Sequence, residues 1–156
     1  MNILTVISVL LWTLHGLCIA CLGVGLFTQD WFEDWNGDSY GIVPFHSDDA
    51  GSFKAMSIMM IVVFVFSVVL LISHGILLIV VWRAGHRGPY SKYIFLMMFL
   101  NGCPLLLVLP PLILFLDHLS PTVFVGSSAV IFLSSIAALI VLGPPFFVSI
   151  RFWIPV

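Results

Sequence analysis

The chain has 156 residues, of which 62% are hydrophobic and only 8% are charged, and its mean hydropathy is +1.23. Soluble domains carry about 25% charged residues, so this composition excludes a domain with a water-facing shell. The net charge of −2 provides no basic surface for nucleic acid. The length is that of one domain.

Four long apolar stretches cover residues 3–27, 55–82, 93–116 and 123–150. Each reaches the roughly 20 residues that a helix needs to cross a hydrocarbon core of about 30 Å. The pattern therefore predicts an all-α membrane protein, a single four-transmembrane-helix bundle that occupies residues 1–156. The first stretch lacks a basic start and is longer than the about 7–15 apolar residues of a signal peptide, so we expect it to remain as a helix.

The segments between the stretches predict the orientation in the membrane. The long loop 28–54 has one basic residue, Lys54, whereas loop 83–92 is rich in Lys and Arg. Because these residues concentrate on the cytoplasmic side, we expect loop 83–92 and both termini to be cytoplasmic, in a protein of the plasma membrane. The loop 28–54 and the short turn 117–122 are then extracellular. The basic residues on the cytoplasmic side are Arg83, Arg87, Lys92 and Arg151.

The extracellular loop holds six of the seven acidic residues. Its Asn36-Gly37 pair is a type I′ turn signal, so we expect a small β-hairpin or sheet there. Its aromatic residues have two interpretations: anchors in the lipid headgroups, which is their common role, or contacts for the outer domain of a partner. The acids lack the spacing of a calcium-binding loop, so we predict a solvated acidic surface and no metal site. The predicted partner-binding residues are Trp31, Trp35 and Tyr40, with Asp34 and Asp38 beside them.

Three polar side chains lie deep in the predicted helices: His15, His74 and Asn101. At about 1.5 Å of rise per residue, they lie roughly 18, 12 and 12 Å from the cytoplasmic boundary, so they could share a layer of the bundle. One interpretation is a proton relay or a metal-binding pair of histidines, because ionisable residues inside membranes often have functions. The other is a neutral histidine that bonds Asn101, a serine or a backbone carbonyl and joins helices by about 0.6–2 kcal/mol. We favour this structural role.

Small residues follow one face of the fourth stretch at Ser127, Ser134 and Ala138, where they predict close helix packing. Cys18 and Cys21 form a Cys-x-x-Cys pair inside the first stretch, a spacing that redox enzymes use. The extracellular loop contains no cysteine that would relay electrons, so the pair is interpreted as packing residues. The sequence also lacks a catalytic triad, a phosphate-binding loop and a membrane carboxylate pair. We predict no enzyme activity and no cofactor.

The order of four helices, a long first outer loop and a short second one resembles the claudin, peripheral myelin protein and stargazin superfamily. Claudin-like first loops carry a tryptophan, then Gly-Leu-Trp and two disulfide-bonded cysteines. Trp31 or Trp35 fits the first position and "GIVPF" (41–45) the second, but the cysteines are missing. Within the superfamily, the chain is similar to the modulator-of-smoothened proteins, which attenuate Hedgehog signalling. The segments that carry this similarity are "LTVIS", "DWF", "WRAGHRGPYSKY" and "VGSSAVIFLSSI".

The resemblance implies a non-enzymatic membrane protein that controls a larger receptor or ion channel. We therefore expect a regulatory or auxiliary subunit that lies in the lipid bilayer and docks on a larger integral membrane protein. Its helix faces and its outer loop would make the contacts. The alternative is a claudin-type cell-junction or paracellular barrier protein. A transporter or redox enzyme is a third class, but four helices without internal repeats leave little room for an alternating-access pathway.

Overall fold

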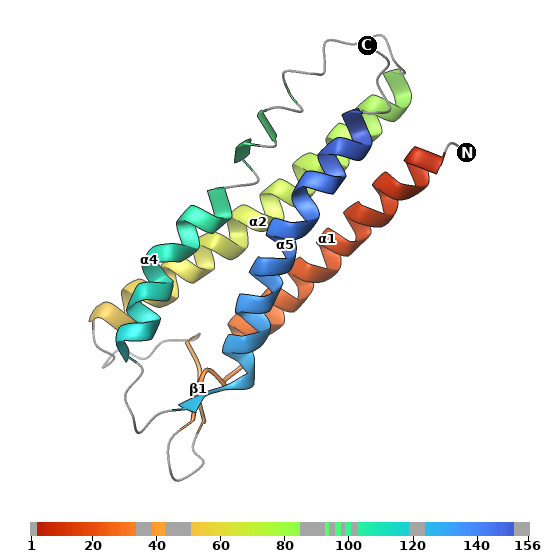
Figure 1. Cartoon of the computed structure of the whole chain (residues 1–156). Helices are drawn as coiled ribbons and strands as arrows, with labels where there is room; N and C mark the ends of the chain where they lie inside the picture. The colour runs from red at the N-terminus through yellow and green to blue at the C-terminus, as the bar shows by residue number, and fades with distance from the viewer. Residues whose placement is uncertain are drawn as a thin grey trace.

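The computed structural model describes residues 3–33, 39–42, 51–84, 93, 96–97, 99–100, 103–118 and 124–151. Four helices form an elongated bundle in this part of the chain (Figure 1). The start of α1, the end of α2 and the end of α5 lie at one end of the bundle, and a small sheet lies at the other. The helices are α1 (Ile3–Phe27), α2 (Gly51–Ala84), α4 (Cys103–His118) and α5 (Ser127–Arg151).

The predicted fold class, an all-α membrane bundle, is confirmed. Three helices of the described chain are long and apolar enough to cross a membrane, over Val6–Phe27, Gly51–Arg83 and Ser127–Phe146. The apolar part of α4, Leu106–Asp117, is shorter. Helix α2 has 34 residues, which corresponds to about 51 Å of length. Because a hydrocarbon core is about 30 Å thick, α2 must tilt or extend beyond it.

Several predicted boundaries differ from the structure. Helix α2 ends at Ala84 rather than at residue 82, and α4 ends at His118 rather than at residue 116. Helix α2 begins at Gly51 rather than at residue 55, so its first turn reaches into the predicted outer loop. Helix α5 begins at Ser127 rather than at residue 123, because Phe124 and Val125 form a strand. Aromatic and β-branched residues favour strands. The boundary between strand and helix was missed because the residues on both sides of it are hydrophobic.

The sheet has three short antiparallel strands in the order β2-β1-β3. Strand β1 (Phe32–Glu33) is central: Phe32 lies opposite Tyr40 of β2 (Ser39–Tyr40) on one side and opposite Val125 of β3 (Phe124–Val125) on the other. Strands β1 and β2 come from the first outer loop, and β3 comes from the segment before α5. The sheet therefore joins the long outer loop to the segment before α5, a pairing that the sequence did not predict.

The helices pack as two pairs, α1 with α5 and α2 with α4, and α1 also contacts α2. Gly25 lies at the tightest part of the first pair. A Cβ atom at Gly25 would lie 2.8 Å from the backbone nitrogen of Phe132 and 2.9 Å from the carbonyl oxygen of Ser128. Both distances are shorter than a real Cβ contact, so the absence of a side chain at Gly25 allows α1 and α5 to approach this closely.

Among the described residues, most buried apolar side chains belong to one of two clusters. The larger joins all four helices to the outer segment, and includes Trp31, Phe32, Phe115 and Phe132 among its thirteen residues. The smaller lies where α2 and α5 meet, around Val81 and Phe146. The outer end of the bundle thus holds most of the described core, and the loop is part of that core.

Candidate functional site

Trp31 lies at the centre of the outer core, directly after α1. Its side chain is 0% exposed. The indole ring meets Phe115 edge-on, with centroids 5.6 Å apart, and is tilted against Phe132 at 5.3 Å. Its Nε1 donates a hydrogen bond of 2.7 Å to the carbonyl of Gly25. Because both its apolar and polar parts are satisfied within the chain, the prediction that Trp31 contacts a partner is wrong, and so is its interpretation as a lipid-facing anchor.

Asp30 fixes the same segment to the start of α5. Its carboxylate accepts hydrogen bonds from the Ser127 backbone nitrogen, at 3.1 Å, and from the Ser127 hydroxyl. Its carbonyl accepts a bond of 3.0 Å from the backbone nitrogen of Ser128. A negative side chain at a helix N-terminus satisfies unpaired N–H groups and interacts favourably with the helix dipole. One of the six loop acids is therefore structural.

Two further contacts join residues 28–31 to residues 126–128, on either side of the Asp30 contact. The hydroxyls of Thr28 and Ser128 are 2.5 Å apart, and the Gly126 nitrogen donates a hydrogen bond to the Trp31 carbonyl at 2.9 Å. A Cβ atom at Gly126 would collide with the Asp30 carbonyl, so only glycine allows this crossing. Neither Asp30 nor Gly126 stands out in the sequence, because the contact between their segments joins positions about a hundred residues apart.

The far end of the sheet is attached to α2. Ile42 is fully buried in the outer core, and its carbonyl accepts a 2.9 Å hydrogen bond from the Ser57 hydroxyl. A Cβ atom at Gly41 would lie 2.9 Å from the Cα of Gln29. The chain that leads into β1 and the chain that leaves β2 therefore lie against each other. The described parts of the outer loop are thus fixed at both sides, to α5 through Asp30 and to α2 through Ile42.

The other predicted partner-binding residues lie around the connection between β1 and β2. Tyr40 is in β2, opposite Phe32. Asp34, Trp35 and Asp38 lie outside the described residues. The structure therefore leaves their predicted role untested.

The small-residue face of α5 does not coincide with its packed face. Ser134 is exposed and Ala138 is half-buried, whereas Ser127 takes part in the contact with Asp30. The buried small residues are their neighbours Ser128 and Ser135. Ser127 and Ser134 have the same spacing along α5 as Ser128 and Ser135, so spacing does not distinguish the two faces. The face with Ser128 is the packed one because it lies against Gly25 of α1. Within the chain, the prediction that Ser127, Ser134 and Ala138 form the packing face is therefore wrong.

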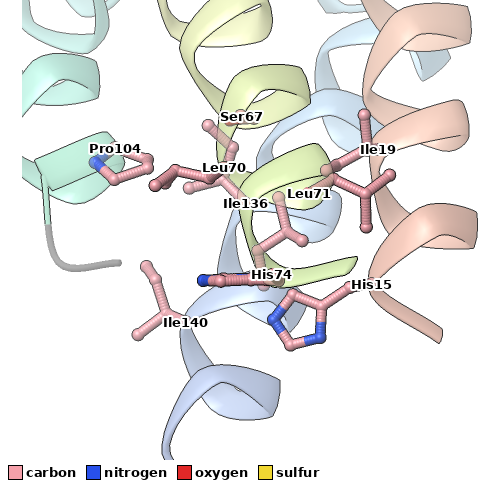
Figure 2. Close-up of a pocket in the computed structure, with 10 residues that line it drawn as sticks. His15, Ile19, Ser67, Leu70, Leu71, His74, Pro104, Ile136 and Ile140 are labelled. Carbon is pink, nitrogen blue, oxygen red and sulfur yellow. The ribbon is translucent and has the colours of Figure 1, made fainter. Parts of the chain in front are cut away.

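His15 and His74 meet inside the membrane-spanning part of the bundle. Their side chains are 3% and 1% exposed, and their ring centroids are 5.9 Å apart in an edge-to-face arrangement (Figure 2). Phe146 of α5 contacts both rings, at 5.8 and 5.2 Å. His15 Nδ1 is 3.0 Å from the carbonyl of Leu11. The two histidines thus lie in one layer of the bundle, and Asn101, the third residue considered for that layer, lies outside the described residues.

Little in the described residues suggests redox or metal chemistry. Cys18 is half-buried, Cys21 is exposed on the outside of α1, and neither is in a disulfide. Among the described residues, no group of three or more His, Cys, Asp or Glu side chains converges as a metal site would require. The described residues thus provide an outer sheet attached to α1, α2 and α5, which we call the outer platform, and a buried pair of histidines.

Comparison with known proteins gives one match. Residues 1–115 match the model of a family described as "Tight junction protein, Claudin-like". This match covers the segment from α1 to most of α4 and therefore includes the whole first outer loop. No curated protein and no solved structure matches the chain.

Proposed function

The chain belongs to the claudin-like family of tight junction proteins, and on that premise we propose that it is a regulatory or auxiliary subunit of a larger membrane protein. It has no enzymatic role in this proposal and docks on an integral membrane receptor or ion channel. The similarity of its short segments to modulator-of-smoothened proteins supports a role in restraining such a partner.

The observation that carries the proposal is the double attachment of the outer sheet. Asp30 and Trp31 tie β1 to α5 and to the core, while the Ile42 carbonyl ties the end of the sheet to α2. A connection held at its base in this way loses less conformational entropy on binding than a free loop. The segment 34–40, which we call the outer docking segment, connects these fixed points.

The composition of the outer docking segment suits recognition of a basic outer domain. It contains Asp34, Trp35, Asp38 and Tyr40. The aromatic side chains of this loop that are buried in the core are Trp31 and Phe32, among the described residues. Aromatic residues dominate the energy of interface centres. Acidic residues around them accelerate the association with a basic partner and make it depend on salt.

A face of α5 offers the second contact, within the membrane. Ser134 is exposed and Ala138 is half-buried, and exposed Val130 and Val141 continue this outward side. In lipid, helices associate through close packing of small residues rather than through the hydrophobic effect. This face is free of the α1 contact and is proposed to meet a helix of the partner.

The proposed orientation places the sheet outside the cell. Arg83 and Arg151 lie at the end of the bundle where α1 begins, opposite the sheet (Figure 1). Basic residues near membrane helices favour the cytoplasm. The protein is proposed to lie in the plasma membrane with both termini cytoplasmic.

A junction or paracellular barrier protein is the second candidate, and the family description favours it. The cysteines argue against it: all three lie within or beside the helical segments, and none lies in the first outer loop. Claudin-like barrier loops use a cysteine pair to fix their sheet. Here Asp30 and Trp31 supply the attachment, to the chain's own helices.

Docking is tested by changing the outer docking segment alone. Full-length protein with Trp35→Ala, Asp34→Lys and Asp38→Lys is purified from membranes in mild detergent, and co-purifying membrane proteins are quantified by mass spectrometry. Loss of one hot-spot aromatic costs about 2 kcal/mol or more, so we expect partner recovery to fall at least about tenfold. Trp82→Ala, which removes an exposed tryptophan from the opposite end, is the matched control and should retain the partner.

The same variants separate the two candidates. Altered ion permeability of an epithelial cell layer, together with unchanged recovery of every membrane protein, would favour the barrier function. Unchanged recovery and unchanged permeability, at equal surface levels, would reject the outer docking segment as a functional surface.

A further inference from the structure

A small cavity lies beside the two histidines, between α1, α2, α4 and α5 (Figure 2). Its volume open to water is about 20 Å³. One water molecule requires about 10–15 Å³ in the same measure, so the cavity has room for a water molecule and little more. Apart from His15, His74 and Ser67, its described walls are apolar: Ile19, Leu70, Leu71, Pro104, Ile136, Leu139 and Ile140.

The hydrogen bond of His15 fixes which of its nitrogens carries the hydrogen. Nδ1 lies 3.0 Å from the Leu11 carbonyl oxygen, and a carbonyl oxygen only accepts. Nδ1 must therefore donate, and in a neutral imidazole the other nitrogen, Nε2, then presents a lone pair. The described lining has no acidic side chain to balance a charged ring, and an unpaired charge in an apolar interior is very costly.

Nε2 of His15 therefore needs a donor. The atom is shielded from solvent and has no hydrogen-bond partner among the described residues. The Ser67 hydroxyl, also in the cavity wall, already donates to the Val63 carbonyl at 2.8 Å. Leaving a buried polar atom unsatisfied costs about 1–3 kcal/mol, which favours a small donor in the adjacent space.

We propose that this cavity is a binding site for one water molecule, which donates a hydrogen bond to Nε2 of His15. The His74 imidazole, whose ring lies 5.9 Å from that of His15, is the second polar partner of the water. Buried waters usually make about three hydrogen bonds, with two to four as the common range. The water thereby adds a second polar link between α1 and α2, beside the direct 3.1 Å bond from Trp12 Nε1 to the Leu71 carbonyl.

A neutral ligand fits the site better than a cation. Two imidazoles would bind a soft monovalent metal ion through their lone pairs, but such an ion brings a positive charge. The described walls contain no carboxylate to balance it, and burying an uncompensated charge costs far more than a missing hydrogen bond. An apolar molecule would leave Nε2 unsatisfied.

The experiment measures contact between water and the His15 ring in the native chain. Full-length protein with ¹⁵N-labelled histidine is placed in lipid bilayers and studied by solid-state NMR with magnetisation transfer from water. His15→Gln identifies the His15 resonances by their loss. We expect Nδ1 to be protonated, Nε2 to be unprotonated and hydrogen-bonded, and the ring to receive magnetisation from water.

Two variants test the second partner. His74→Phe keeps an aromatic ring against Phe146 but removes the polar partner, so water transfer to His15 should be lost or strongly reduced. Trp12→Phe removes the nearby 3.1 Å bond from Trp12 Nε1 to the Leu71 carbonyl and part of the indole beside Gly75, but it changes no residue of the cavity lining. It is the matched control and should leave the transfer unchanged.

Three results would overturn the proposal. One is a folded native protein in which the His15 ring receives no magnetisation from water. Another is protonation of Nε2 with an unprotonated Nδ1. The third is a contact from the Asn101 amide in place of water, recognised because Asn101→Leu abolishes the hydrogen-bonded Nε2 signal whereas His74→Phe does not.

Discussion

Replacing Trp31 with alanine tests whether the outer platform depends on this one side chain. The indole is fully buried, meets two aromatic rings at 5.6 and 5.3 Å, and donates a 2.7 Å hydrogen bond. Truncation of a buried tryptophan costs about 3–5 kcal/mol. Of this, each aromatic pair accounts for about 0.5–1.5 kcal/mol, and the hydrogen bond for a similar amount. We therefore expect Trp31→Ala to lower the free energy of unfolding by about 3–5 kcal/mol.

The measurement is reversible unfolding of the purified protein in mild detergent. Helix content is monitored by far-ultraviolet circular dichroism, a signal that does not use tryptophan fluorescence. Trp31→Phe keeps one aromatic ring against its neighbours but removes the N–H donor and part of the indole, so it should cost less, about 1–3 kcal/mol. Trp82→Ala is the control, because that side chain is 67% exposed, and it should change stability little. If Trp31→Ala unfolds like the native protein and instead releases a bound partner, Trp31 is a surface residue and not part of the core.

Three other changes have defined outcomes. Gly25→Ala should lower the unfolding free energy by about 1–3 kcal/mol, because its Cβ would lie 2.8 Å from the α5 backbone; Gly51→Ala, where a Cβ meets nothing within 4 Å among the described residues, should have little effect in the same denaturation. Asp30→Ala should cost about 0.5–2 kcal/mol through loss of the α5 cap, and faster hydrogen exchange confined to the first turn of α5 would show it, whereas uniform exchange would contradict it. The Cys18→Ala, Cys21→Ala double variant should match the parent in reducing and oxidising conditions, and a trapped mixed disulfide in the native chain would show that the pair has redox chemistry.

The helical framework could be predicted because the membrane imposes a local requirement. A spanning segment must satisfy its own backbone polar groups, and a long apolar run meets this requirement as a helix. The start of α1 and its end at Phe27 agree with the prediction. The strand at Phe124–Val125 was missed because strand pairing is a property of two segments, and its partner Phe32 lies far away in the sequence.

The burial of individual side chains was less predictable. Trp31 follows directly after α1, where a tryptophan commonly faces lipid headgroups, and the sequence does not indicate that Phe115 and Phe132 enclose it. Ser127 and Ser134 have the same spacing as Ser128 and Ser135. The choice between these faces depends on Gly25 of another helix, which is information that α5 does not contain. That His15 and His74 could share a layer was predictable, because depth in the membrane is a simple count along each helix. Their contact at 5.9 Å depends in addition on how α1 and α2 pack, which the count does not give.

The pairing of α1 with α5 has a consequence for biogenesis. Helix α1 is synthesised well before its main neighbour α5, and the hydroxyls of Thr28 and Ser128 meet across 100 residues. At a synthesis rate of about 5–20 residues per second, α1 waits roughly 5–20 s before α5 is made. During that interval the groove around Gly25 faces lipid or a membrane chaperone. Ribosomal stalling or premature termination before residue 127 therefore yields a chain whose first helix lacks its main neighbour, and we expect membrane quality control to degrade it.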